Sequence, residues 1–174
     1  MSKEHTVEAW LNGPVEGVPD LLQPVAHALL NASQQVHEAI DGLSPEELAS
    51  RPRGVASVSY HVRHAIGSLD RLFTYARGEG LSSEQRKALL LETAAEDGAL
   101  TAVELLASFD EAIERALRQL RATDPATLLE NRGVGRAQLP STVLGLLFHG
   151  GEHSVRHAGQ TVTTAKLVRG AKSD

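Results

Sequence analysis

Apolar residues recur every three to four positions in four long segments of this 174-residue chain. This period matches one face of an α-helix, and no segment shows the strict alternation of a β-strand. The segments cover residues 20–41, 57–78, 101 to about 120, and 141–169. A chain of 18.6 kDa has the length of one domain. The sequence therefore predicts a single all-α domain over residues 1–174, a four-helix bundle without a sheet, with residues 171–174 frayed.

Capping patterns mark the starts of helices, both in the long segments and between them. A serine or threonine followed three positions later by glutamate or glutamine occurs at residues 44–47, 82–85 and 101–104. Such a capping box satisfies two free backbone N–H groups at a helix start. Asp124 and Pro125 open a further turn. We therefore expect short helical pieces in the connections of the bundle.

Composition excludes several classes of protein and of site. The chain has no cysteine, which rules out disulfide scaffolds, thiolate zinc sites and iron–sulfur clusters. Its net charge of −5 and aromatic content of 3% do not suit nucleic acid, which requires a basic face and stacking side chains. No stretch has the apolar length of a membrane span, and residues 1–10 lack the apolar core of a signal peptide. We expect a cytoplasmic protein that binds neither nucleic acid nor membrane.

Five of the eight histidines fall in two of the predicted helices. His61 and His64 are three positions apart in the second segment, and the last segment has histidines at intervals of four, His149, His153 and His157. Steps of four advance about 40° around a helix, so these three form one ridge. Two imidazoles at i and i+4 can bind one ion, and a third from a facing helix completes a site with open positions. The alternative is that these histidines are solvated or hydrogen-bonded and bind nothing.

The ligand type indicates which ions such a site would hold. Neutral imidazoles suit divalent Zn, Ni, Cu or Fe, whereas the lack of carboxylate and thiolate disfavours Mg, Ca and the softest ions. No glutamate follows His153, so the zinc-protease pattern is absent. Helical periodicity places His61 nearer than His64 to the apolar stripe of its helix. By itself, the periodicity favours His61 as the third ligand.

The last segment is apolar on more than one side. Its only charged side chains between positions 139 and 165 are Glu152 and Arg156. One face should therefore meet the bundle core, and the other a cavity or a subunit interface. Gly150 and Gly151 fall in mid-helix, where they favour close helix approach or room for a ligand; the alternative is a break in the helix. We expect the core-facing stripe, with the histidine ridge opposite, to consist of Leu144, Leu147, Phe148, Val155, Ala158, Val162 and Ala165.

Two segments carry a family resemblance. Residues 57–72, SVSYHVRHAIGSLDRL, and residues 147–160, LFHGGEHSVRHAGQ, resemble the second and last helices of DinB-like proteins. The resemblance implies a four-helix bundle, commonly dimeric, with one divalent metal held by three histidines. Matched position by position, these are His64, His153 and His157, so the resemblance selects His64 where periodicity favours His61. The sequence departs from the family at Ala158, where arginine is common.

The resemblance also suggests residues that support the ligands. His149 and Gln160 match motif positions that are not usually direct ligands. We expect them, with His61 and Glu152, to lie beside the ligands and orient them. Glu152 or His149 is the candidate proton carrier.

The function implied by the resemblance is varied, because a fold does not fix a reaction. Some relatives are transferases or isomerases that use the thiols mycothiol or bacillithiol. We therefore expect a metal-dependent enzyme whose Zn, Ni or Fe ion activates a thiol or water, as a thiol-dependent S-transferase or isomerase or as a hydrolase of a small molecule. The competing hypothesis is a non-catalytic metal-binding or dimeric stress-response protein. In either case, the apolar last helix predicts a homodimer.

Overall fold

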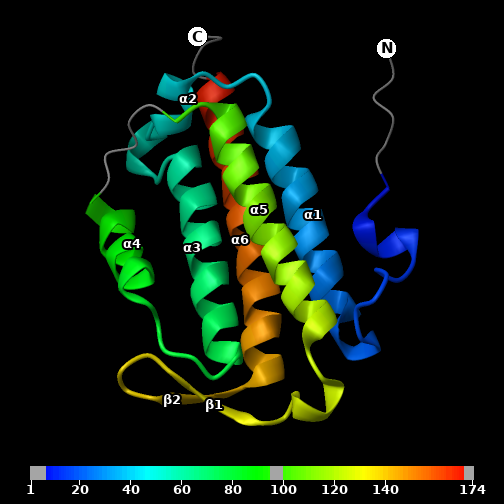
Figure 1. Ribbon diagram of the computed structural model, residues 1–174. Coiled ribbons are helices and arrows are strands. Elements are labelled where there is room, and N and C mark those ends of the chain that lie inside the picture. The colour runs from blue at the N-terminus through cyan, green and yellow to red at the C-terminus, as the bar shows by residue number, and fades with distance from the viewer. Residues whose placement is uncertain (1–6, 95–99, 171–174) are drawn as a thin grey trace.

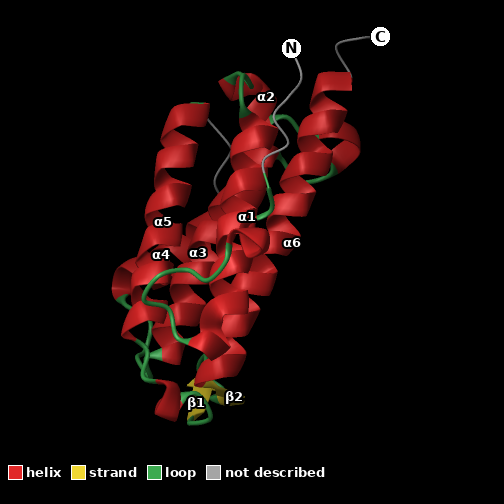
Figure 2. Cartoon of the chain, turned by 90° about the vertical axis from the view of Figure 1, so that its right-hand side faces the viewer, coloured by secondary structure: helices red, strands yellow, loops and turns green. Residues whose placement is uncertain are grey.

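The computed structural model describes residues 7–94 and 100–170 and is mostly helical, as predicted (Figure 1). Four long helices form the bundle: α1 (Gln23–Ile40), α3 (Val58–Ala76), α5 (Ala102–Ala122) and α6 (Val143–Gly170). Helix α6 packs against both α1 and α3, and α5 packs against the same two helices. The colours of Figure 1 show α1 and α6 running in one direction along the bundle and α3 and α5 in the other, and Figure 2 shows the bundle from the side. The first and last long helices of the chain are thus neighbours.

The predicted capping boxes are present at the helix starts. Ser44 caps the short helix α2 (Pro45–Ala49), and Thr101 caps α5, each with both hydrogen bonds of the box. Ser82 accepts the backbone N–H of Gln85 at 3.1 Å at the start of helix α4 (Ser83–Ala94). The connections also contain 3₁₀ turns, at Ala9–Asn12, Asp20–Leu22, Pro52–Gly54 and Pro125–Thr127.

A single apolar core lies between the four long helices. Its largest side chains with almost no solvent exposure include Leu29 of α1, Leu69 of α3, Phe109 and Leu117 of α5, and Leu147 of α6. Every long helix therefore contributes to the same core, and the bundle forms a rigid frame on which side chains from different helices can be held in fixed relation. No helix within residues 7–94 and 100–170 has the length and apolarity to cross a bilayer.

The prediction that no sheet is present is wrong at one place. Strands β1 (Asn131–Val134) and β2 (Leu139–Thr142) form an antiparallel hairpin between α5 and α6. Each strand has four residues, and Gly133 pairs with Pro140, so the alternation that identifies a strand in a sequence is too short and too interrupted to detect. Arg132 Nε donates to the Ala76 carbonyl at 2.9 Å and attaches the hairpin to the end of α3.

Helix α4 is longer than the short helical piece expected from the capping box at residues 82–85. It has twelve residues, but its side chains from Ser83 to Leu91 are exposed except for Gln85, which is half-buried, and the Glu92 side chain is only 9% exposed. A helix that buries so little shows no apolar period, and periodicity therefore does not reveal its extent. The prediction of fraying at residues 171–174 falls outside the described residues.

Helix α6 continues without a break through Gly150 and Gly151. A Cβ atom at Gly150 would lie 2.7 Å from Cε2 of Phe73 on α3, and one at Gly151 would lie 3.2 Å from Cγ1 of Val25 on α1. The two glycines therefore allow α6 to approach both neighbouring helices closely. This agrees with the expectation of close helix approach at these positions. The alternative of a helix break is wrong.

Candidate metal centre

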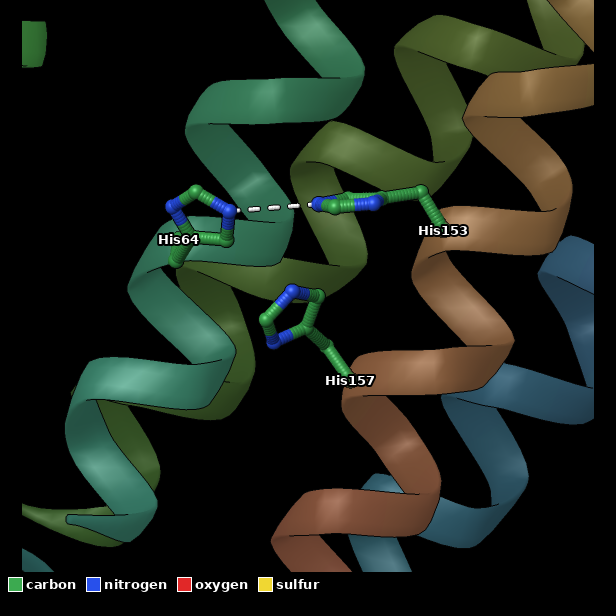
Figure 3. A group of neighbouring side chains, drawn as sticks. All are labelled: His64, His153 and His157. Atoms are coloured by element: carbon green, nitrogen blue, oxygen red, sulfur yellow. Dashed lines mark hydrogen bonds between the residues drawn. The ribbon is translucent and has the colours of Figure 1, made fainter. Parts of the chain in front are cut away.

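The two groups of histidines meet across the interface between α3 and α6. The Ser57 hydroxyl accepts the backbone N–H of Tyr60 and fixes the start of α3, one turn before His61 and two turns before His64. On α6, the close packing of Gly150 places His153 and His157 opposite them. Figure 3 shows the rings of His64, His153 and His157 pointing toward one another from the two helices.

His64, His153 and His157 form a compact group of nitrogen atoms. One ring nitrogen from each residue can be chosen so that all three lie within 4.8 Å of one another. Nε2 of His64 lies 3.2 Å from Nε2 of His153, and the ring of His157 is centred 4.6 Å from that of His64 and 4.5 Å from that of His153. Three imidazoles from two helices, with no carboxylate between them, are suited to a transition metal with open coordination positions.

His61 lies on the inner side of this group. It is buried, as its helical phase predicts, and its Nδ1 lies 3.3 Å from Nδ1 of His157. The set of three nitrogens with ligand spacing nevertheless contains His64 and not His61. The assignment of His64 as the third ligand therefore remains a prediction, now with compatible geometry.

Burial and mutual proximity lower the pKa of three histidines in and beside this group: His61, His153 and His157. Burial first, and then the neighbouring histidines, lower the pKa of His153 to about 4 and that of His157 to about 4. The same two causes, burial and then His64, lower the pKa of His61. Near pH 7, His153 and His157 are therefore neutral, which is the form that binds metal.

One buried atom of the group has no partner. Among the described residues, Nδ1 of His153 is enclosed and makes no hydrogen bond. A buried polar nitrogen without a partner costs free energy, and such groups are often associated with a functional site. The donor set itself, neutral imidazoles from two helices with nitrogens within 4.8 Å, fits a site that would hold a divalent ion.

Three residues that the sequence analysis did not select contact His64 directly or through one another. Glu92 of α4 accepts a hydrogen bond from Nδ1–H of His64 at 3.1 Å and forms an ion pair with Arg71. The Ser68 hydroxyl lies 3.2 Å from Nε2 of His64. Burial raises the pKa of Glu92, but its bonds to His64 and Arg71 outweigh burial and hold that pKa below its usual range. The positions of Ser68 and Arg71, four and seven residues after His64, could have placed them on its face of the helix; no sequence signal identifies Glu92.

The other predicted site residues lie toward the solvent. His149 is exposed, and its Nδ1 lies 3.3 Å from the Glu152 carboxylate, which also pairs with Arg156. This pairing with Arg156 holds the pKa of Glu152 below its usual range. His149, Glu152 and His153 form a second group with ligand spacing. Gln160 is exposed and makes no hydrogen bond to any of the described histidines.

The expected core-facing stripe of α6 is only partly correct. Leu147, Ala158 and Ala165 are buried, but Phe148 is 58% exposed. The histidine ridge does not lie opposite the core, because His157 is itself buried. Small and polar residues lie between the apolar ones on the buried face. Because they are weakly hydrophobic, the apolar periodicity does not identify which face of α6 is buried. These residues are Gly150, Gly151, Ser154, Thr161 and Thr164.

Comparison with known proteins agrees with this architecture. Residues 28–161, which include all four long helices in whole or in part, match the DinB superfamily. The chain belongs to the DinB superfamily. No curated protein sequence matches it significantly.

A solved structure shares the DinB fold of this chain. The crystal structure of a conserved protein from Enterococcus faecalis superposes with a TM-score of 0.64 at 18% sequence identity. The match covers 86% of this chain and 97% of the other. At this identity the similarity shows the fold alone. The superfamily membership and the histidine group are together compatible with metal binding.

Proposed function

We propose that this DinB protein is a metal-dependent enzyme that binds one divalent ion through His64, His153 and His157. The observation that carries the proposal is the convergence of three imidazole nitrogens, from two helices, within 4.8 Å. We propose Zn, Ni or Fe(II) as the ion, since neutral imidazoles bind each of them. When bound, such an ion supplies Lewis acidity that lowers the pKa of a thiol or water and makes it a nucleophile near pH 7.

The side chains around the group have distinct roles in this proposal. His153 and His157 remain neutral because their pKa values are about 4, so protons do not compete with the ion near neutral pH. Glu152, ionised beside His149 and Arg156, is the proton acceptor nearest the exposed edge of the group. A small-molecule substrate would enter from this edge, and a low-molecular-weight thiol such as mycothiol or bacillithiol is the proposed co-substrate.

Metal analysis of protein purified without a histidine tag tests the site. We expect one divalent ion per chain, and we expect His153→Ala to lose most of it. His27→Ala is the matched control, since His27 lies on α1 and bonds the Gly13 carbonyl away from the group. Unchanged stoichiometry in the His153→Ala protein would overturn the ligand assignment.

Activity measurements separate the enzyme from a non-catalytic metal-binding protein. The metal-loaded and chelator-treated proteins are each given mycothiol or bacillithiol with an electrophilic aryl halide, and separately an activated ester. We expect metal-dependent turnover of one of these substrate types. Stoichiometric metal without turnover of either would favour the alternative, a metal-binding or stress-response protein without catalysis.

We also propose that the partner of the chain is a second copy of itself. Phe148 on α6 is 58% exposed beside a groove of about 370 Å³ that Pro24 and Ala28 of α1 also line. An exposed aromatic residue at an apolar groove is typical of an interface, and two-fold symmetry lets the same patch serve both copies. Light scattering at micromolar concentration should give twice 18.6 kDa, and Phe148→Asp should give a monomer.

A further inference from the structure

Within residues 83–92 of helix α4, two polar side chains form hydrogen bonds to α3. Gln85, near its start, donates from Nε2 to Oδ2 of Asp70 at 2.7 Å and to Oγ1 of Thr74 at 2.8 Å. Glu92, two turns later, reaches His64 and Arg71. The other side chains of α4 from Ser83 to Leu91 are exposed. Gln85 and Glu92 therefore help to hold α4 beside α3 (Figure 1), and Glu92 is bonded to a proposed metal ligand.

The second anchor occupies a place shaped for a carboxylate. The Glu92 side chain is only 9% exposed, and Arg71 contacts both of its oxygens, with Nη2 3.2 Å from Oε2. Gly67 on α3 leaves the space that the carboxylate fills, since a Cβ atom at that position would collide with Oε1 of Glu92. The glycine, the arginine and the glutamate thus form one arrangement that presents Oε2 to His64.

This arrangement determines which nitrogen of His64 carries the proton. A carboxylate paired with arginine can only accept a hydrogen bond, so Nδ1 of His64 must be the donor. With that proton on Nδ1, Nε2 carries the lone pair, and it faces Nε2 of His153 and the Ser68 hydroxyl, each at 3.2 Å. A histidine that binds metal through one nitrogen commonly donates from the other to a carboxylate, which fixes the ring and increases its basicity.

We infer that Glu92 is a positioning residue for His64, and that through this contact the docking of α4 and the occupancy of the histidine site are coupled. The inference rests on the proposed metal site. Coupling between two equilibria is reciprocal, so an ion that binds better when α4 is docked must also stabilise the docked helix by the same factor. Helix α4 would then be loosely held in the metal-free protein and held more firmly in the loaded one.

Four variants test the inference by zinc affinity, measured by competition with a chelator. Glu92→Ala should weaken zinc binding about 10- to 100-fold, the usual cost of losing a carboxylate behind a histidine ligand. Gly67→Ala should also weaken zinc binding, because the added methyl group displaces the Glu92 carboxylate. This variant removes no polar group. Glu84→Gln changes the same charge on the exposed side of α4 and should leave the affinity unchanged. Gln85→Ala releases the other anchor without touching His64 and should have a smaller effect than Glu92→Ala.

Two further measurements do not depend on activity. Nitrogen-15 NMR of the metal-free protein should show His64 protonated at Nδ1, and this tautomer should be lost in Glu92→Ala but retained in Gln85→Ala. Hydrogen exchange should show α4 amides protected on addition of zinc to the wild type, with a much smaller change in Glu92→Ala.

The outcomes separate failure of the inference from failure of the proposed function. If the wild type binds no zinc, the metal proposal fails, and the coupling fails with it, whatever the tautomer of His64. If the wild type binds zinc but Glu92→Ala and Gly67→Ala bind it equally well, the positioning role is overturned while the metal site stands. Equal losses in Glu92→Ala and Gln85→Ala, with the His64 tautomer unchanged, would also overturn the positioning role.

Discussion

The interface between α3 and α6 has two halves of opposite character. In one half, Leu69 and Phe73 of α3 pack against Gly150 of α6, and all three are buried. In the other half, about one turn further along α6, the contacts are made by histidines: His61 and His64 from α3, His153 and His157 from α6. The same two helices thus form a dry, closely packed contact and a polar one next to each other.

The difference shows how a bundle can hold a polar cluster in its interior. The apolar half contributes stability and sets the separation and register of the helices. The histidine half contributes little stability, since it contains an unpartnered nitrogen and imidazoles that burial keeps uncharged. If this division holds, changes in the apolar half should alter folding, and changes in the histidine half should alter ligand and proton binding.

The largest effect on folding is expected from Leu147→Ala in the apolar half. Leu147 is fully buried on α6, and its truncation leaves a cavity, so the free energy of unfolding should fall by about 2–5 kcal/mol. Leu167→Ala is the control on the same helix, because Leu167 is 42% exposed and should change stability by less than about 1 kcal/mol. Urea denaturation measures both. Equal losses would show that the apolar half does not dominate stability.

The histidine half should respond to metal instead. Zinc at 100 times its dissociation constant should raise the free energy of unfolding of the wild type by about 2.7 kcal/mol. His153→Ala should lose this increment, whereas His27→Ala should keep it. Urea denaturation with zinc and with a chelator provides the comparison. An undiminished increment in His153→Ala would place the ion elsewhere.

A smaller effect distinguishes two glycines of α6. A Cβ atom at Gly150 would meet the Phe73 ring at 2.7 Å, so overpacking in Gly150→Ala should lower the free energy of unfolding by about 1–3 kcal/mol. The higher helix propensity of alanine should offset about 1 kcal/mol of this loss. Gly159 has no atom within 4 Å of such a position, so Gly159→Ala should instead be stabilising, by up to about 1 kcal/mol. The midpoint of thermal denaturation should therefore fall in Gly150→Ala and rise in Gly159→Ala. A shift in the same direction would mean that close approach at Gly150 is not required.

An effect of similar size concerns protons in the metal-free protein. His153 and His157 have pKa values of about 4 when folded but about 6.5 when unfolded, so their contribution to stability is fully present above pH 6.5. It is lost as the pH falls from 6.5 toward 4, because the unfolded chain then binds more protons. At pH 6 the free energy of unfolding should be about 1–2 kcal/mol lower than at pH 7.5. His153→Gln should reduce this difference. An unchanged pH dependence in this variant would show that the loss of stability at pH 6 does not come from the buried histidines.

Much of the bundle could be predicted from the sequence because the long helices bury broad apolar faces and begin at capping residues. The capping boxes at residues 44–47, 82–85 and 101–104 are all present. The hairpin was not predicted, because its strands are short and interrupted by Gly133 and Pro140. The predicted buried face of α6 is only partly correct, because glycine, serine and threonine line much of the face that is buried.

The candidate site was predictable on one side only. Histidines repeat along two helices, and helical spacing brings such residues onto one face, so the cluster has a local signal. Glu92 has none, because it reaches His64 from a separate helix, 28 positions along the chain. A contact of that kind depends on how α4 lies on α3, and the exposed sequence of α4 does not encode this in its hydrophobic pattern.

The position of the histidines along the chain has a consequence for how the protein is made. His64 and His153 are 89 positions apart, so an ion held by both would cross-link the chain over half its length. A covalent link that closes a loop of that size destabilises the unfolded chain by roughly 4–5 kcal/mol through lost conformational entropy, and a metal link acts in the same way. During synthesis, His64 leaves the ribosome long before the two histidines of α6. If the proposed site binds an ion, an unfinished chain would present only one of its three ligands, and metal loading would report that the last helix has been made and has docked.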